Sequence, residues 1–121
     1  MNYRKELSRA TMNRVVLNLD SKEEADTALV SISNIMTAGG YMVSYADPLI
    51  TTAACISIAS NVFKLKNQGF IDACWEYGDR RFTIYVIKHI ISPTWFDFPR
   101  YGIVVDLDDD TVAVQLKLAL A

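Results

Sequence analysis

Hydrophobic and polar positions follow two different periods along this chain, and the clearest pattern lies between residues 14 and 47. Residues 15–19 form a short apolar run, which is typical of a strand. Residues 21–38 then carry apolar side chains at the three- and four-residue spacing of a helix that packs one face on a core. Tyr41–Ala46 is expected to leave this helix as a second extended segment. The pattern therefore predicts a β-α-β-like packing unit.

The two ends of the predicted helix carry their own signals. Ser21 and Glu24 are spaced as in a capping box, in which the serine hydroxyl accepts from the Glu24 amide and the Glu24 carboxylate accepts from the Ser21 amide. Gly39 and Gly40 follow the last helical position, where glycine tolerates the left-handed conformation that ends many helices. These signals predict a helix of about residues 21–38.

The middle of the chain holds three further segments. Leu49–Ser60 follows Asp47-Pro48; its β-branched residues favour a strand and its small residues permit a helix, and we expect a helix. Val62–Lys66 alternates apolar and polar side chains and predicts a strand. Phe82–Ile91 is apolar on both faces, which is typical of a strand in the centre of a sheet.

The C-terminal region alternates most regularly. Tyr101–Leu107 and Thr111–Leu120 are each expected to be a strand, joined across Asp108–Asp110 into a β-hairpin. The sum is an α+β fold, in which a mostly antiparallel sheet carries one helix packed on it and a C-terminal β-hairpin. We expect one domain, residues 1–121, with residues 1–13 as an N-terminal arm or short helix.

Composition adds an expectation of self-association. Apolar residues make up 51% of the chain, which is high for a short chain, and the predicted terminal strand would present an unpaired edge. We therefore expect a homo-oligomer. The formal net charge of −2 gives no global attraction to nucleic acid or to a membrane surface. No apolar run has the length of a membrane span, and the charged start does not fit a signal peptide, so we expect a cytoplasmic or virion location.

The two cysteines, Cys55 and Cys74, each lie among apolar neighbours and lack the spacing of metal ligands. Buried thiols in a reducing compartment are expected rather than a disulfide.

An acidic run near the C-terminus invites a calcium interpretation. Asp106, Asp108 and Asp110 have alternate spacing, but the positions where an EF-hand loop needs glycine and glutamate hold Thr111 and Lys117. A solvated turn accounts for these carboxylates, and we expect no metal site.

The only histidine, His89, lies within the predicted central strand. It is expected to be a partly buried strand residue. A general base would need a nucleophile and an orienting group, which the sequence does not place beside His89. Cys74 is available as a nucleophile, but no motif surrounds the pair. The glycines form no phosphate-binding motif. We therefore expect no catalytic residue and no cofactor.

Basic and aromatic residues gather between residues 64 and 81. Arg80 and Arg81 lie near Trp75 and Tyr77, a combination that single-stranded nucleic acid sites use. Acidic residues in the same stretch offset the positive charge, so nucleic-acid binding is not expected.

The segment SPTWFDFPRY, residues 92–101, is rich in aromatic side chains where polar turn residues are usual. Two prolines restrict it, and aromatic and arginine side chains dominate interface hot spots. One hypothesis makes this loop a protein-binding surface; the other makes two or three of its rings a lid over the core. The candidate contact residues are Trp95, Phe96, Phe98, Arg100 and Tyr101.

Residues 14–47, RVVLNLDSKEEADTALVSISNIMTAGGYMVSYAD, resemble a family of small bacteriophage-encoded proteins of unknown function. In that family a strand, a Ser-x-Glu-Glu-Ala-led helix and a Tyr-x-x-x-x-Ala-Asp segment occur in the same order. The resemblance implies a phage accessory or assembly protein and carries over no catalytic residue.

The sequence as a whole favours a non-enzymatic module that binds protein, such as a phage accessory protein or an inhibitor of a host protein. A virion or assembly component is the nearest alternative. The alternatives from other classes are a small enzyme that uses His89 or the acidic run, and a nucleic-acid binder that uses Arg80, Arg81 and the basic N-terminal arm.

Overall fold

The computed structural model describes residues 12–45, 49–50, 53–65, 70–90 and 99–120. Within these residues, three helices accompany a five-stranded sheet of strand order β1-β5-β4-β3-β2, and all neighbouring strands are antiparallel. The predicted α+β class with an antiparallel sheet is therefore confirmed. The elements in chain order are β1 (Asn13–Leu19), α2 (Lys22–Ala38), β2 (Leu49–Ile50), α3 (Ala53–Val62), β3 (Ile71–Gly78), β4 (Phe82–Ile90), β5 (Pro99–Leu107) and α4 (Asp110–Ala119).

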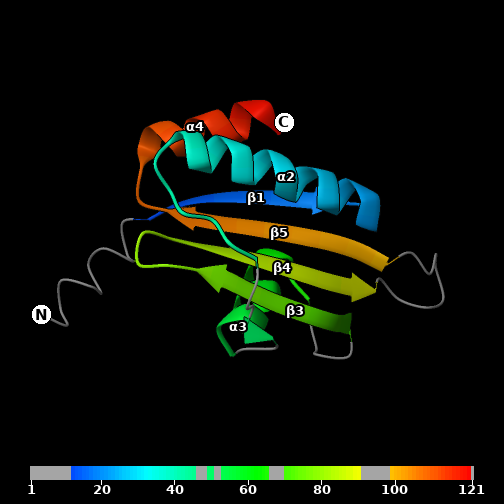
Figure 1. Ribbon diagram of the computed structural model, residues 1–121. Coiled ribbons are helices and arrows are strands. Elements are labelled where there is room, and N and C mark those ends of the chain that lie inside the picture. Colours follow the sequence, from blue (N-terminus) through cyan, green and yellow to red (C-terminus); the bar gives the residue numbers. More distant parts are fainter. Residues whose placement is uncertain (1–11, 46–48, 51–52, 66–69, 91–98, 121) are drawn as a thin grey trace, which may run out of the picture.

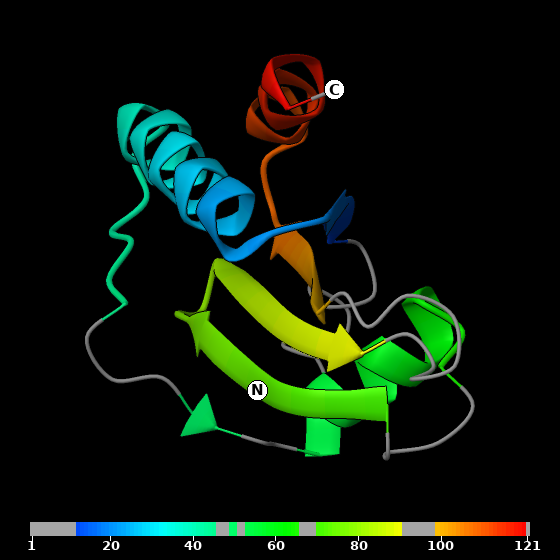
Figure 2. The ribbon, with the colours of Figure 1, turned by 90° about the vertical axis from the view of Figure 1, so that its right-hand side faces the viewer.

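The sheet separates two layers of helices. Figures 1 and 2 show α2 and α4 together on one side of the sheet and α3 on the other. Strand β4 lies in the middle of the sheet and is buried on both faces, as its sequence predicts. Ile84 and Val86 belong to the core beneath α2 and α4, whereas Tyr85 and Ile87 belong to a second core beneath α3. The two-residue period of a strand thus supplies both cores from one segment.

Helix α2 begins and ends at the residues that its capping signals indicate. The Ser21 hydroxyl accepts from the Glu24 amide at 3.2 Å, while the Glu24 carboxylate accepts from the amide of Asp20 rather than that of Ser21. At the other end Gly40 has φ 94°, and the Tyr41 amide donates to the Met36 carbonyl at 2.9 Å. This geometry is a Schellman motif, so the predicted glycine stop is confirmed at the second glycine of the pair.

The predicted C-terminal hairpin is wrong, because Asp110–Ala119 is helix α4. The Asp109 carboxylate accepts from the amides of Thr111 and Val112 at 2.8 and 3.2 Å and so caps the helix. Val112, Ala113 and Leu116 then face the core beneath α2 and α4. The apolar residues of this segment fit helical spacing as well as the alternation of a strand, and the cap favours the helix.

Three other local predictions can be compared with the structure. The helix expected in Leu49–Ser60 is present as α3, which begins at Ala53, and with α2 and α4 it brings the described helices to three, where the predicted fold packed one helix on the sheet. The strand expected in Val62–Lys66 is wrong: α3 continues to Val62, and Lys64 has φ 55°. Residues 41–45 form no strand, so the β-α-β-like unit is not completed, although the rings of Tyr41 and Tyr45 pack edge-on against Phe82 and Tyr77.

The expectation of two free thiols is also wrong. Cys55 on α3 and Cys74 on β3 form a disulfide across a Cα–Cα distance of 6.1 Å, and neither residue is exposed. Sequence spacing alone does not show that α3 folds back over β3, which is the contact that brings the two residues together. The bond joins α3 to the sheet beneath it.

Candidate protein-contact face

The aromatic loop expected to bind protein lies mostly outside the described residues, among them Trp95, Phe96 and Phe98. Arg100 belongs to β5 and pairs with His89 of β4. Tyr101 is half-buried and packs against the core beneath α2 and α4. In the described part of the loop, one aromatic ring, that of Tyr101, therefore packs on the face of the sheet that α2 and α4 cover.

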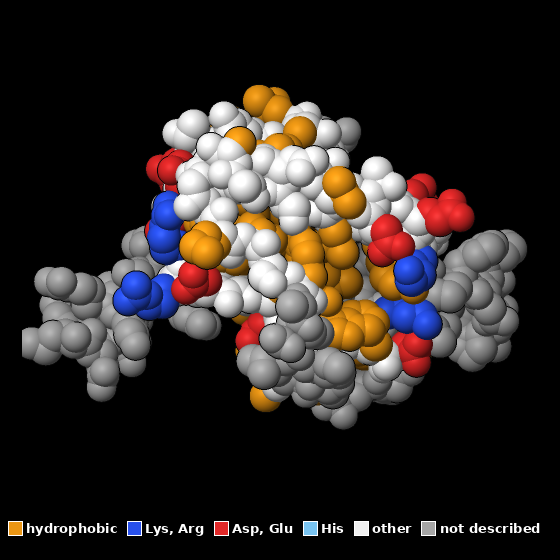
Figure 3. All heavy atoms as spheres, in the orientation of Figure 1, with side chains coloured by type: hydrophobic (Ala, Val, Ile, Leu, Met, Phe, Trp, Pro, Cys, Tyr) orange, Lys and Arg blue, Asp and Glu red, His pale blue; other side chains and the backbone are white. Residues whose placement is uncertain are grey.

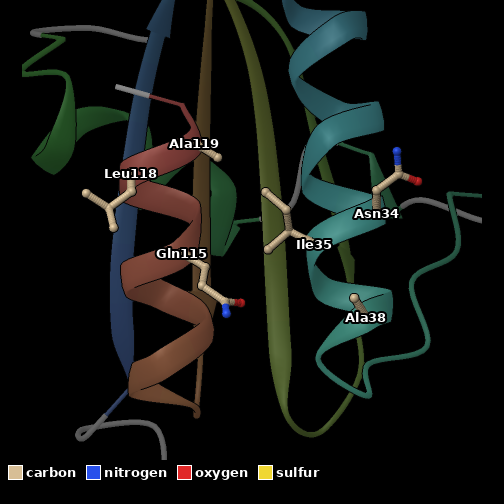
Figure 4. Close-up of a pocket in the computed structure, with 6 residues that line it drawn as sticks. All are labelled: Asn34, Ile35, Ala38, Gln115, Leu118 and Ala119. Atoms are coloured by element: carbon tan, nitrogen blue, oxygen red, sulfur yellow. The ribbon is translucent and has the colours of Figure 1, made fainter.

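A second candidate surface is the groove between α2 and α4. It holds about 560 Å³ and is lined by two amide side chains and four apolar residues: Asn34, Ile35, Ala38, Gln115, Leu118 and Ala119. Figure 4 shows the Gln115 and Ile35 side chains in the space between the helices and the Leu118 side chain on the side of α4 away from α2. None of the six lining residues carries a charge, so the groove suits an uncharged partner surface.

The two helices approach each other closely where α2 ends and α4 begins. At the end of α2, a Cβ added to Gly39 would lie 2.6 Å from Cγ2 of Val112 in the first turn of α4. Glycine therefore permits an approach that a larger residue would prevent. The space between the helices stays open on its outer side, and Ala38 and Ala119 are the small residues of its lining.

The surface around the groove is apolar for a helical surface. Val30 on α2 is 60% exposed, and Val114 and Leu118 on α4 are 53% and 77% exposed. In Figure 3 the charged side chains lie toward the two sides of the face shown, while hydrophobic and neutral side chains occupy its middle. Exposed apolar side chains that gather in this way are characteristic of interaction sites.

The acidic run near the C-terminus is divided among separate structural roles. Asp106 accepts two hydrogen bonds from the Arg14 guanidinium, both at 2.8 Å, and this hydrogen bonding raises the pKa of Arg14. Asp108 accepts from the Tyr41 hydroxyl and pairs with Arg81, and Asp109 caps α4. No group of three or more His, Cys, Asp or Glu residues with the geometry to hold a metal occurs within the described ranges.

Tyr41 lies beside a polar hollow that is lined by Arg81 and residues 108–111. Its hydroxyl donates to Asp108 at 2.5 Å and accepts from the Asp109 amide at 3.2 Å. The Arg81 guanidinium lies 4.4 Å from the ring centroid and donates to the Gly40 carbonyl at 3.4 Å. These contacts hold the end of α2 against the β3–β4 turn and the start of α4. The polar side chains at the hollow therefore have a structural role.

Of the residues considered for enzymatic or nucleic-acid chemistry, His89 and Cys74 are buried, Trp75 and Tyr77 are partly buried, and Arg80 and Arg81 are exposed. His89 is 3% exposed and its ring lies beside that of Phe63, with centroids 5.8 Å apart. Cys74 is consumed in the disulfide, which removes the nucleophile from that pair. Trp75 and Tyr77 pack against the core beneath α2 and α4, so their faces are not a platform for stacking bases.

The groove combines residues that the sequence assigned to two different kinds of element. Asn34, Ile35 and Ala38 lie in the correctly predicted helix, whereas Gln115, Leu118 and Ala119 were assigned to a strand. The signal that would have found the second set is Asp109, a strong helix N-cap directly before the apolar run.

Comparison with known proteins adds no relative. No family model matches the chain, and no curated protein or solved structure matches it either. In the described part of the chain, no helix combines the length and the apolar character needed to cross a membrane.

Proposed function

We propose that the protein is a non-enzymatic protein-binding module whose contact face is the outer surface of α2 and α4. The observation that carries the proposal is the uncharged groove between these helices, with exposed apolar side chains on both sides of it. Grooves of this kind bind the apolar face of a helix in many recognition domains. The burial of His89 and the oxidation of Cys74 weigh against the enzymatic alternative.

The first partner that this face suits is a second copy of the chain. Asn34 and Gln115 each carry a hydrogen-bond donor and an acceptor, so each can pair with an identical amide across a two-fold axis. Ala38 and Ala119 are small enough to let two helix layers approach closely. The absence of charge among the lining residues removes the like-charge repulsion that self-association would otherwise meet.

Light scattering of the purified protein tests this proposal. The wild-type chain should have a mass above 13.6 kDa at micromolar concentration. Ala38→Lys and Ala119→Lys should return the monomer mass, because two like charges would meet in the contact and a cation in the last turn of a helix does not weaken the helix. The matched control is Asn61→Lys, which adds a cation to the last turn of α3 on the other side of the sheet.

Two results would contradict the proposed face. The first is a wild-type mass of 13.6 kDa at every concentration. The second is an oligomer that both lysine variants leave intact.

Two biological settings remain for such a module. The resemblance of residues 14–47 to small phage proteins supports an accessory protein or inhibitor that acts on a host protein. The disulfide supports a virion or assembly component, because disulfides persist on virion surfaces and are rare in the reducing cytosol. Thiol titration of protein taken from its native source separates the two: free thiols favour the intracellular setting, and an intact disulfide favours the virion.

A further inference from the structure

The two edges of the sheet differ in how well they are protected. The β2 edge is a strand of two residues, Leu49–Ile50, and short edge strands are one way in which proteins avoid unwanted pairing. The β1 edge is a strand of seven residues, all of them in continuous register with β5. Among the described residues no strand pairs with the outer side of β1.

Strand β1 lacks three other devices that protect an edge: a proline, a bulge and an unpaired charge. It contains no proline, and the irregularity of the sheet lies in β3 between Ile71 and Ala73. Its single charged residue, Arg14, is engaged by both oxygens of Asp106 within the chain. Backbone donors and acceptors along the edge are therefore not guarded by an unneutralised charge, a bulge or a proline.

Apolar side chains flank this edge on both faces of the sheet. Val16 is 46% exposed on the face opposite α4. On the other face α4 packs over β1, and Figure 4 shows its Leu118 side chain directed away from α2, toward the outer side of β1. Val114 is four residues earlier, so it shares that side of the helix. An added strand would thus meet apolar side chains on the α4 face, and on the other face it would meet Val16 between Arg14 and Asn18.

A second copy of the chain does not fit this edge as a continuous sheet. Paired strands lie about 4.8 Å apart, whereas packed helices need about 8–10 Å between their axes. Because α4 lies over β1, pairing of two β1 strands would force two α4 helices closer than this limit. The occupant must therefore be a strand that carries no helix above it.

We propose that β1 and the outer side of α4 form a docking edge for an extended segment of a partner protein, which adds a sixth strand to the sheet. This inference rests on the proposed function as a protein-binding module and names the partner class for a second surface. The segment carries apolar, preferably β-branched, side chains at alternate positions on the α4 side, against Val114 and Leu118. Its other side is neutral and polar where it faces Arg14 and Asn18. Main-chain hydrogen bonds supply affinity and the alternate side chains supply specificity.

The probe is a fluorescein-labelled peptide of about nine residues, which covers the seven-residue strand, with alternating valine and threonine and one lysine at each end. Fluorescence anisotropy should show saturable binding to the full chain. The same peptide with alternate backbone amides N-methylated should not bind, because it cannot donate to the edge. Hydrogen exchange at amides of β1 should slow when the parent peptide is present.

Substitutions on β1 and α4 test whether the peptide binds at this edge. Val16→Lys and Val114→Lys should each raise the dissociation constant about tenfold or more, whereas Val30→Lys, at a valine on α2 that is somewhat more exposed, should leave it unchanged. The same variants separate this proposal from the proposed function. Val16→Lys should leave self-association intact. Ala38→Lys should abolish self-association without weakening peptide binding.

The proposal is overturned if the parent peptide shows no binding up to about 1 mM. It is also overturned if the N-methylated peptide binds equally well, or if Val30→Lys weakens peptide binding as much as Val16→Lys does.

Discussion

At the scale of single residues, Tyr41 connects parts of the chain that are far apart in the sequence. It follows the Gly39-Gly40 pair, and its ring packs edge-on against Phe82 at a centroid distance of 5.6 Å. Its hydroxyl joins Asp108 to the start of α4, and Arg81 covers the ring. Three segments distant in sequence therefore meet at one side chain, which only the folded chain can show.

Tyr41→Phe should lower the free energy of unfolding by about 1–2 kcal/mol, because the hydroxyl is hydrogen-bonded to a charged group and the ring is buried. Urea unfolding at pH 8 measures this loss. Tyr45→Phe is the control: its hydroxyl donates to the Leu29 carbonyl at 3.3 Å, a neutral and longer bond, so the loss should be about 1 kcal/mol or less. Equal losses in the two variants would show that the hydrogen bond to Asp108 stabilises the fold no more than a neutral hydrogen bond does.

The Tyr41 contact should also depend on pH. Burial, followed by the hydrogen bond to Asp108, raises the pKa of Tyr41 from the ordinary value of 10 to about 12. The folded state thus holds the phenol proton more tightly than the unfolded chain does, so this stability is fully present below pH 10 and is lost as the pH rises toward 12. The difference in unfolding free energy between wild type and Tyr41→Phe should therefore shrink across that range. A difference that stays constant from pH 8 to pH 12 would contradict the assignment.

At the scale of elements, the residues of α4 show how a sequence pattern can satisfy two periods. The apolar residues from Val112 to Leu120 alternate, yet Val112, Ala113 and Leu116 also form the buried stripe of a short helix. The carboxylate of Asp109 satisfies two amides at the start of the helix, which a strand would not require. The first turn of the helix is therefore where the choice between strand and helix is made.

Asp109→Ala should lower the free energy of unfolding by about 1 kcal/mol, the usual loss when an N-cap side chain is removed. Asp110→Ala is the matched control, because Asp110 lies one residue later and favours the helix only through the helix dipole, a contribution of about 0.3–1 kcal/mol. Urea unfolding of both variants gives the comparison. A larger loss for Asp110→Ala would contradict the capping role of Asp109.

The elements that sequence reasoning predicted are those in which local signals agree. Helix α2 has a cap, a helical period and a glycine stop, and β4 has a long apolar run; both are present. The errors fall where the deciding interaction is distant in sequence or rests on one side chain. No local pattern near Cys55 predicts its pairing with Cys74. The groove could not be predicted either, because its residues on α4 line it only when that segment is a helix.

At the scale of the whole molecule, one sheet serves two cores of different construction. The core beneath α2 and α4 is the larger and contains no covalent link, whereas the core beneath α3 is small and contains the disulfide. A ten-residue helix on a small core buries little apolar surface, so α3 depends on the disulfide to stay packed on the sheet, whereas α2 and α4 are held by apolar packing. The side of the molecule opposite the proposed contact face is therefore the one that depends on oxidation.

Reduction of the Cys55–Cys74 bond should consequently destabilise the molecule unevenly. The bond spans 19 positions of sequence, and closing a loop of this size is worth about 3 kcal/mol. Because both cysteines are fully buried, the protein should be reduced in denaturant with a dithiol and refolded without oxygen. Thiol titration should then find both thiols, and urea unfolding should show the loss of about 3 kcal/mol. Hydrogen exchange should quicken in α3 far more than in α2, since α2 contacts neither cysteine's core. Equal quickening in both helices would show that the two cores unfold as one unit, and thiols already free before reduction would show that α3 is held by packing alone.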